Sequence, residues 1–299
     1  MIVFVTGGSG YIGSRVALAF AREGYDVRAL VRSKEKGAFL LEEEILPVIG
    51  ELKDVESYRA QIEMADVIVH AAAATGTEKA VLDEIFIDAV LQVTGGRTDH
   101  KHFIYTSGCF IYGNTDGKVF DEKSPINPIG IVKWRRSHEE KVLNAQDSHL
   151  KTLVLRPGFV YGGRRGWTDL WFESMTQGNI EMIGTGENCF SMVHRDDLAR
   201  AYVLAAQKKV SGMVLNITDN EPVLVKEIVF GIAALGPALI RSIPYEEALK
   251  KMGPIAEGLS IDQKISSDKA IHLLGWRPHL PPMARDLSRY HRVFLNQSK

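Results

Sequence analysis

The chain has 299 residues, of which 45% are hydrophobic and 24% charged, and its formal net charge at pH 7 is −1. This length and hydrophobic content are enough to bury a large core, either as one large domain or as two closely joined ones. The nearly balanced charge gives no indication of a nucleic acid or an anionic membrane as a partner.

The cysteines and the first residues of the chain indicate the cellular compartment in which the protein is expected. Cys109 and Cys189 are the two cysteines, which is too few for a disulfide framework and indicates a reducing compartment. The first predicted strand begins at Ile2, which leaves no room before it for a signal or transit peptide. No apolar run approaches the roughly 18 residues that a membrane span requires. We therefore expect a cytoplasmic protein that has no membrane partner.

The opening stretch predicts a strand, a turn and a helix in succession. Residues 2–5 form an apolar run, glycines follow at Gly7, Gly10 and Gly13, and apolar side chains then recur at helical spacing over residues 12–20. This order is typical of a buried parallel strand that leads through a tight glycine turn into a helix.

Each glycine has a task in a dinucleotide-binding site. Gly7 allows the turn, Gly10 lets backbone N–H groups approach a pyrophosphate, and Gly13 lets the helix pack close to the strand. The helix N-terminus then presents unpaired N–H groups and the positive end of its dipole to the phosphates. Because a second strand is predicted soon afterwards, at residues 27–31, we favour dinucleotide binding over an ordinary glycine turn.

The end of this second strand bears on the choice of cofactor. An NAD site usually has an acid there that binds the ribose 2′-hydroxyl, whereas this chain has Arg32, followed by Ser33, Lys34 and Lys36. A guanidinium suits a 2′-phosphate, so we expect NADP(H) to be preferred, with NAD(H) as the other candidate. The alternative interpretation is a solvated basic turn.

The next elements complete a nucleotide-binding sheet. A third strand is predicted at residues 46–49, and Asp54 after it is a candidate helix N-cap. A fourth strand, residues 66–70, runs into small side chains beside which a cofactor can lie. Apolar spacing predicts a helix at residues 77–93, and residues 102–108 are predicted to be a fifth strand that leads into a loop.

The second half of the chain is less regular. A strand is predicted at residues 153–155, a helix at residues 196–207 and a further strand at residues 214–218. Beyond Asn220 the chain is punctuated by prolines and glycines, which is typical of irregular elements around a cleft.

Six motifs lie in order along nearly the whole chain. They are TGGSGYIG (6–13), HAA (70–72), YTSGCFIYG (105–113), LRPGFVYG (155–162), VHRDDLA (193–199) and LGWRP (274–278). With these motifs the chain resembles the extended short-chain dehydrogenase/reductase family, which includes sugar-nucleotide epimerases and dehydratases and dihydroflavonol-type reductases. The resemblance implies an α/β fold: a Rossmann-type, doubly wound parallel sheet with a smaller C-terminal substrate-binding region.

The resemblance also implies a division of the chain and a set of cofactor contacts. Residues 1–161 are expected to form the dinucleotide-binding domain, and residues 162–299 mainly the substrate-binding region, with about 193–217 returning to the sheet domain. The residues expected to bind the cofactor are Gly7, Gly10, Tyr11, Ile12, Gly13, Arg32, Glu51, Leu52, His70, Ala71, Ala72, Thr106, Lys133 and Pro157. No residue is assigned to a metal.

The family's catalytic residues are a Ser or Thr that positions the substrate oxygen, a Tyr that transfers the proton, and a Lys four residues beyond the Tyr. When this motif is anchored on Pro128 and Gly130, Ile129 falls on the Tyr position and Lys133 on the Lys position. Gly108 falls on the Ser position. Isoleucine carries no proton and glycine has no hydroxyl, so two of the three catalytic positions are vacant.

Other side chains are candidates for the missing chemistry. Lys133 is still expected to contact the cofactor ribose, and Tyr161, with Tyr112 as a second choice, is the candidate for a replacement hydroxyl. A structural tyrosine is the competing interpretation of both. Cys109 is interpreted as a buried, inert thiol, because alternation along an extended backbone turns it away from the site. Trp167, Trp171 and Phe172 are interpreted equally as part of a substrate lid and as core packing.

One further departure from the family bears on the substrate. Relatives that act on nucleotide sugars carry an Arg four residues before the conserved His, where it clamps the diphosphate. This chain has Phe190 at that place, before His194. The loss of this charge favours a smaller or more apolar substrate.

We therefore expect an NADP(H)-dependent oxidoreductase or isomerase that acts on a small or apolar carbonyl or alcohol with a non-standard proton donor. Two alternatives remain: a non-catalytic NADP(H)-binding redox sensor or scaffold, and an epimerase or dehydratase that recycles its cofactor. The expected partner is a small-molecule substrate. Family members commonly pair through helices that correspond here to about 77–95 and 130–146, so a homodimer is an alternative to a monomer.

Overall fold

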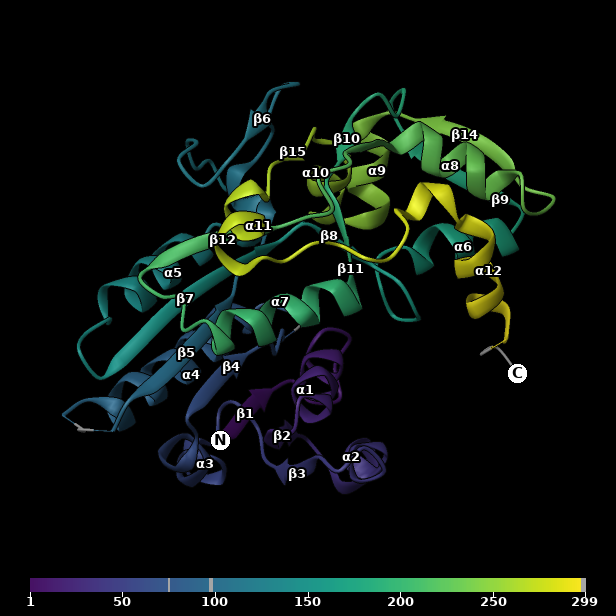
Figure 1. Ribbon diagram of the computed structural model, residues 1–299. Helices are drawn as coiled ribbons and strands as arrows, with labels where there is room; N and C mark the ends of the chain where they lie inside the picture. The colour runs from purple at the N-terminus through teal and green to yellow at the C-terminus, as the bar shows by residue number, and fades with distance from the viewer. Residues whose placement is uncertain (75, 97–98, 297–299) are drawn as a thin grey trace.

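The computed structural model describes residues 1–74, 76–96 and 99–296. Its centre is a parallel sheet with the strand order β12-β7-β5-β4-β1-β2-β3 (Figure 1). The strands are β1 (Ile2–Thr6), β2 (Asp26–Val31), β3 (Leu46–Ile49), β4 (Val67–His70), β5 (Lys101–Thr106), β7 (Leu150–Pro157) and β12 (Met213–Ile217). The chain builds outward from β1 to β3 and then returns to β4 on the other side of β1. The doubly wound α/β fold predicted from the sequence is confirmed.

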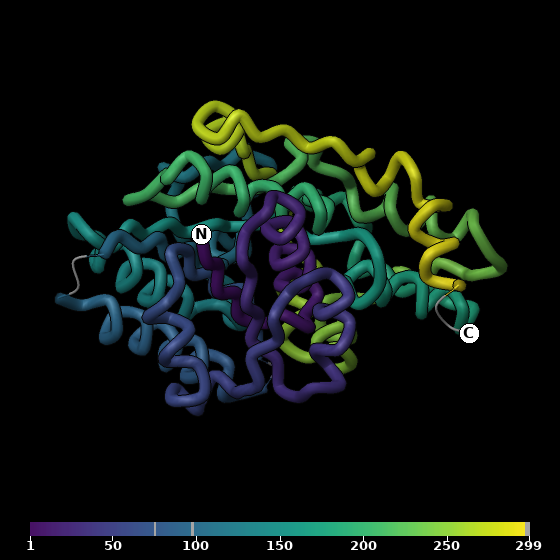
Figure 2. The backbone as a smooth tube through the Cα atoms, turned by 60° about the horizontal axis from the view of Figure 1, so that its bottom comes forward, coloured from purple at the N-terminus to yellow at the C-terminus, as the bar shows by residue number. Residues whose placement is uncertain are grey.

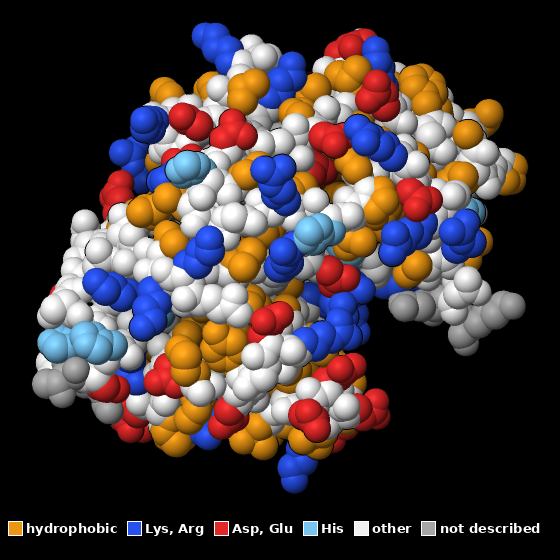
Figure 3. Space-filling model, in the orientation of Figure 1, with side chains coloured by type: hydrophobic (Ala, Val, Ile, Leu, Met, Phe, Trp, Pro, Cys, Tyr) orange, Lys and Arg blue, Asp and Glu red, His pale blue; other side chains and the backbone are white. Residues whose placement is uncertain are grey.

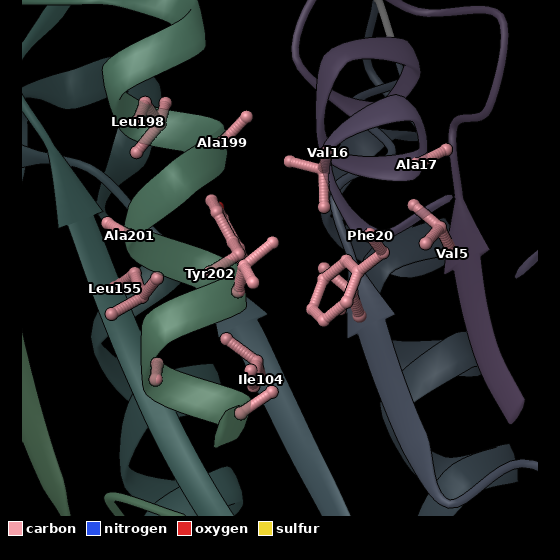
Figure 4. Close-up of a cluster of buried hydrophobic side chains, with 14 of the residues drawn as sticks. Val5, Val16, Ala17, Phe20, Ile104, Leu155, Leu198, Ala199, Ala201 and Tyr202 are labelled. Carbon is pink, nitrogen blue, oxygen red and sulfur yellow. The ribbon is translucent and has the colours of Figure 1, made fainter. Parts of the chain in front are cut away.

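Helices cover both faces of this sheet. The side chains of β1 alternate, so that Val3 and Val5 face one layer of helices whereas Phe4 faces the other. The first layer is α1 (Gly13–Arg22), α2 (Lys34–Leu41), α7 (Arg195–Gln207) and α11 (Asp268–Leu274), and the second is α3 (Arg59–Met64), α4 (Lys79–Thr94) and α5 (Arg135–Asn144). Figure 4 shows the core under the first layer, where α1 and α7 lie side by side above the strands.

A smaller region lies beside the sheet and is built on short strand pairs. The pairs are β6 (Val119–Phe120) with β15 (Lys264–Ile265), β8 (Phe159–Tyr161) with β11 (Met192–His194), β9 (Asn179–Ile183) with β14 (Leu239–Ile243), and β10 (Cys189–Phe190) with β13 (Val223–Leu224). Its helices are α6 (Asp169–Thr176), α8 (Val225–Ala233), α9 (Tyr245–Met252), α10 (Ile255–Ser260) and α12 (Leu287–Asn296). None of the helices that the structure describes is long and apolar enough to cross a membrane.

Several element boundaries differ from those predicted. The strand predicted at residues 153–155 is the longer β7, because it pairs with β5 on one side and β12 on the other. The prediction that Asp54 caps a helix is wrong. A single 3-10 turn, Val55–Ser57, follows it without a side-chain capping bond, and α3 begins only at Arg59. The Ser57 hydroxyl donates a hydrogen bond to the backbone carbonyl oxygen of Asp54 (2.6 Å).

The C-terminal segment ties the two regions together. In Figure 2 it runs, in yellow, from α11 on the sheet across the molecule to α12. Asp197 of α7 is its buried attachment point. The two oxygens of the carboxylate accept the backbone N–H groups of His279 and Leu280, each at 3.0 Å, and the Asp197 carbonyl accepts the Trp276 indole N–H at 2.8 Å. One carboxylate therefore fixes the path between α11 and α12.

Replacing Asp197 with Ala should lower the free energy of unfolding by about 3 kcal/mol, because two backbone N–H groups lose a buried, charged acceptor. Thermal or denaturant unfolding measures this. The matched control is Asp196→Ala, which removes a partly exposed ion pair with Arg15 and should cost at most about 1 kcal/mol. Equal losses in the two variants would contradict the role given to Asp197.

Candidate active site

A cavity of about 310 Å³ lies at the carboxyl ends of β1, β4, β5 and β7. Tyr11 and Ile12 enter it from the turn after β1, Ala74 from the chain after β4, Ser107 from the end of β5, and Pro157 from the end of β7. The strand order reverses between β1 and β4, and such a reversal is where open α/β sheets bind their ligands. The cavity is therefore the candidate active site.

The glycine turn beside this cavity fits a pyrophosphate. Gly7 has a φ of +73°, and a Cβ there would lie 2.8 Å from the Cα of Ala72. A Cβ on Gly13 would lie 2.3 Å from the Gly7 carbonyl oxygen, so α1 approaches β1 as closely as predicted. Within the described part of the chain, the backbone N–H groups of Tyr11 and Ile12 have no hydrogen-bond acceptor, and α1 has no side-chain cap. These are the donors that a phosphate needs at a helix N-terminus.

Gly10 completes the turn by donating its N–H to the Gly7 carbonyl oxygen (2.7 Å). Its Cβ would lie 3.0 Å from the same oxygen, so a side chain there would crowd the turn itself. Contact between Gly10 and a pyrophosphate stays a prediction.

His70 belongs to a buried hydrogen-bond network and is not among the described residues that line the cavity. Thr6 Oγ1 accepts the N–H groups of Ala71 (3.2 Å) and Ala72 (3.1 Å), so its own hydrogen goes to His70 Nδ1 (2.7 Å). His70 therefore carries its ring hydrogen on Nε2 and donates it to Asp83 Oδ1 (3.0 Å). The imidazole orders the ends of β1 and β4, and its contact with a cofactor stays a prediction.

Asp83 of α4 is a site residue that the sequence analysis missed. Its Oδ2 accepts hydrogen bonds from the Tyr105 hydroxyl (2.7 Å) and His138 Nδ1 (2.8 Å). Burial alone would raise the pKa of Asp83, but the hydrogen bonds that His138 and His70 donate to its carboxylate outweigh it and hold the pKa well below its usual range. Asp83 therefore presents a fixed negative charge to the cavity that it lines. The available signal was an Asp that shares the helical spacing of the buried residues of α4.

The start of α5 differs in register from the predicted catalytic motif. Lys133 is exposed and is not one of the described residues that line the cavity. The cavity is lined instead by Ile131 and Arg135, which are also four residues apart. Arg135 donates from Nη1 to the Thr106 carbonyl oxygen (2.7 Å). The pair that faces the site is thus shifted by two residues along the chain.

A buried ion pair holds α5 in this register. Glu139 lies one helical turn beyond Arg135 and accepts hydrogen bonds from Arg156 of β7, with Arg156 Nε 2.9 Å from Glu139 Oε1. Both side chains are almost completely buried. Arg156 belongs to the LRPG segment, so the sequence carried a second anchor for the helix, farther along the chain than Pro128 and Gly130.

Ile129 lies behind the cavity wall. It is 3% exposed, and its Cδ1 lies 3.2 Å from where a Cβ on Gly258 would stand. Gly108 does line the cavity, and a Cβ added there would meet only the Pro157 carbonyl oxygen, at 3.9 Å. The neighbouring Ser107 hydroxyl is buried without a partner among the described residues. The position predicted for the catalytic Ser is therefore open, and an unpaired hydroxyl stands next to it.

The two tyrosines considered as replacement donors are engaged elsewhere. The Tyr161 hydroxyl donates to the Pro281 carbonyl oxygen (3.0 Å), and the Tyr112 hydroxyl donates to Asn216 Oδ1 (2.8 Å). Burial raises the pKa of both phenols, and neither is among the described residues that line the cavity. Cys109 lines the cavity, but its thiol donates to the Arg156 carbonyl oxygen (3.2 Å) and burial raises its pKa. It is a buried thiol, as predicted, but the predicted reason is wrong: residues 109–112 form a 3-10 turn and not an extended strand, and Cys109 is not turned away from the site.

The remaining predicted cofactor residues lie at or near the carboxyl ends of their strands. Arg32 follows β2, is exposed, and has no ion pair within the described residues. Glu51 is exposed and pairs with Lys53 (3.0 Å), while the Leu52 carbonyl accepts a hydrogen bond from Tyr58. Thr106 Oγ1 lies 2.6 Å from the hydroxyl oxygen of Tyr202. Their contacts with a cofactor stay predictions.

The outer wall of the cavity is aromatic. Its rings are those of Phe110, Trp134, Phe159 and Trp167. Phe190, at the place of the family's diphosphate clamp, stacks on Phe159 with their ring centroids 4.9 Å apart. The side chains in the wall that carry positive charge are Lys79 and Arg135. The site therefore combines an apolar surface with two cations and the Asp83 carboxylate.

The sequence is similar to known proteins over most of its length. The model of the NAD dependent epimerase/dehydratase family matches residues 3–218. An uncharacterized protein of Schizosaccharomyces pombe is 30% identical over 295 residues, 96% of this chain and 98% of that protein. The decarboxylating sterol-4-alpha-carboxylate 3-dehydrogenase of Dictyostelium discoideum is 27% identical over 74% of this chain and 72% of that enzyme.

A solved structure shows the same fold. It is a dTDP-glucose 4,6-dehydratase of Bacillus anthracis in complex with NAD, with a TM-score of 0.83. The match covers 99% of this chain and 97% of that one at 20% identity, so it bears on the fold alone.

The register of α5 can be tested by placing a Tyr at each position. Ile129→Tyr should lower the free energy of unfolding by about 1–3 kcal/mol, because the ring has to displace packed atoms around Phe110 and Gly258. Ile131→Tyr should cost less than about 1 kcal/mol, because the half-buried Ile131 faces the cavity. Thermal unfolding of the two variants measures both losses. A larger loss for Ile131→Tyr than for Ile129→Tyr would support the register predicted from the sequence.

Proposed function

This chain belongs to the NAD dependent epimerase/dehydratase family, and from that premise we propose that it is an NADP(H)-dependent oxidoreductase of an apolar carbonyl or alcohol. It is a protein of the extended short-chain dehydrogenase/reductase type. The observation that carries the proposal is the aromatic-walled cavity, which lies directly against the glycine turn and contains Lys79 and Arg135. Such a cavity can hold an apolar molecule beside the reactive end of a bound dinucleotide.

The choice of NADP(H) rests on Arg32. It follows β2, at the place where an NAD site usually has an acid, and its exposed guanidinium is free of ion pairs among the described residues. A 2′-phosphate offers it a bidentate partner. The Bacillus anthracis structure contains NAD, so within this fold the end of β2 is the part of the chain expected to decide between the two cofactors.

The choice of substrate rests on the cavity wall and on Phe190. A stacked aromatic pair occupies the region where a nucleotide-sugar enzyme would need a cation, which disfavours a diphosphate. The relative from Dictyostelium discoideum is named for a sterol substrate, which supports an apolar one. These observations favour net reduction or oxidation over the alternative of a sugar epimerase or dehydratase.

The proton is assigned to Lys79. Arg135 keeps its proton at any ordinary pH, Asp83 is held ionised, and burial raises the pKa of Tyr11, whose hydroxyl donates to the Gly162 carbonyl oxygen. Lys79 is half-buried and lines the cavity, and an ammonium can both donate a proton and regain one from solvent.

The cofactor, when bound, supplies or accepts the hydride. In the direction of reduction Lys79 Nζ donates a proton to the carbonyl oxygen as the new C–H bond forms at the carbonyl carbon. Arg135 and the Ser107 hydroxyl supply further hydrogen-bond donors beside that oxygen, and Asp83 keeps the local charge balanced. The apolar wall excludes water from the reacting groups.

Replacing Arg32 with Ala should weaken NADPH binding by roughly 1.5–3 kcal/mol, as expected when a hydrogen bond to a charged group is lost, and leave NADH binding unchanged. Calorimetry with both cofactors measures this. Lys34→Ala is the matched control, because Lys34 is also exposed but lies on α2. Equal losses for NADPH and NADH would show that Arg32 does not read the 2′-phosphate.

Replacing Lys79 with Met should lower kcat for reduction of an apolar ketone by about 10²-fold or more, because the general acid is lost, and leave the Kd for NADPH unchanged. NADPH oxidation followed by absorbance, with a panel of apolar ketones and aldehydes, measures this. Lys133→Met is the matched control, since Lys133 is exposed outside the cavity.

A rescue separates a lost proton donor from a damaged site. Ile131→Tyr together with Gly108→Ser, made in the Lys79→Met protein, should restore part of the rate, because both new hydroxyls would face the cavity. A wild type that binds NADPH but turns over no member of the panel would favour the sensor alternative. Full activity in Lys79→Met would remove Lys79 from the mechanism.

A further inference from the structure

The loop of residues 162–168, between β8 and α6, lies against the glycine turn. The Tyr11 hydroxyl donates to the Gly162 carbonyl oxygen (2.8 Å), and a Cβ on Gly166 would lie 2.5 Å from the Tyr11 hydroxyl oxygen. The loop can follow this path only because glycine stands at that place. Side chains of the smaller region are thereby brought to the turn where the phosphates are expected.

Arg165 is the side chain that this loop places on the turn. It has a φ of +75°, a conformation that costs a non-glycine residue free energy, and its backbone N–H donates to Asp169 Oδ2 (2.7 Å). Its Nη1 donates to the carbonyl oxygen of Ser9 (3.2 Å), immediately before Gly10. The guanidinium is otherwise exposed, so its remaining N–H groups are available to a ligand held by the same turn.

Arg195, at the start of α7, stands on the other side of Tyr11. Its Cζ lies 5.7 Å from the centroid of the Tyr11 ring, and a Cβ on Gly163 would lie 2.1 Å from that Cζ. Its Nε is buried without a hydrogen-bond partner among the described residues. Arg195 is therefore a half-buried cation, packed under the loop, with unused hydrogen-bonding capacity.

These two guanidinium groups differ from their neighbours in making no direct ion pair with a described residue. Arg15 pairs with Asp196 (2.5 Å) and Arg164 with Asp169 (3.3 Å), whereas Arg165 and Arg195 have no ion pair within the described residues. Figure 3 shows the resulting gathering of basic side chains between the adjacent ends of α1 and α7. Two guanidinium groups that make no direct ion pair with a described residue, beside unpaired backbone N–H groups, form a site for a multiply charged anion.

We propose that Arg165 and Arg195 form the second half of the pyrophosphate site, opposite the N-terminus of α1. This inference rests on the proposed function, because it requires that the turn bind a dinucleotide. The turn supplies N–H groups and a helix dipole, which together provide only about half a positive charge. The two arginines neutralise the rest of the charge of the pyrophosphate, and Arg165 contacts it from a loop that belongs to the smaller region.

The experiment measures binding of ADP-ribose, NADH and NADPH by calorimetry, without any turnover. ADP-ribose carries the pyrophosphate and lacks the nicotinamide. Arg165→Ala should weaken all three ligands by a similar factor, about tenfold, and should reduce the dependence of Kd on salt. Arg165→Lys should keep part of the affinity. Arg195→Gln should also weaken binding of all three ligands. The melting temperature of this variant without ligand shows whether the packing under the loop is preserved.

The controls separate this proposal from the others. Arg285→Ala removes an exposed arginine that pairs with Glu221 far from the turn, and it should change no Kd. Arg32→Ala should affect NADPH alone. Unchanged ADP-ribose binding in Arg165→Ala would overturn the proposal and leave the proposed function intact. A wild type that binds none of the three ligands would overturn the proposed function and this inference together.

Discussion

The Asp83 carboxylate is the interaction on which the arrangement of the active site depends. It is carried by α4 and accepts hydrogen bonds from His70 of β4, Tyr105 of β5 and His138 of α5, while Thr6 of β1 orients the His70 ring. A buried charge is costly unless it is fully paired, so these donors are held at the positions that satisfy it. The ends of three strands and two helices are thereby held in one geometry around the cavity.

The second constraint is the ion pair between Arg156 and Glu139, which decides which face of α5 the cavity meets. Anchoring the catalytic motif on Pro128 and Gly130 selects Ile129 and Lys133, whereas the cavity is lined by Arg135, the first residue of α5, and by Ile131 in the 3-10 turn before the helix. The error arose because the rotation of a helix is set by contacts with a distant strand and not by the loop that precedes it.

The parts of the site that were predicted are those that depend on neighbours in sequence. The glycine turn is one: Gly7 needs its positive φ and Gly13 its close approach whatever lies elsewhere in the fold. The parts that were missed depend on tertiary partners. In the sequence Asp83 is one of several polar residues of α4, beside Glu84 and Asp88. Tyr161 is expected near the cleft because its motif is. Only the folded chain shows that Asp83 faces the cavity and that Tyr161 is bonded to Pro281.

The two ligand sites share one segment of the chain. The loop of residues 162–168 presents Arg165 to the glycine turn and, two residues later, presents Trp167 to the wall of the cavity. The same loop is pressed against Tyr11 and is followed by Asp169, which holds its backbone. Arg165 and Trp167 are separated by Gly166 alone, and Gly166 packs directly against the Tyr11 hydroxyl. The contact of this loop with Tyr11 therefore places one part of it at the glycine turn and another part in the wall of the apolar cavity.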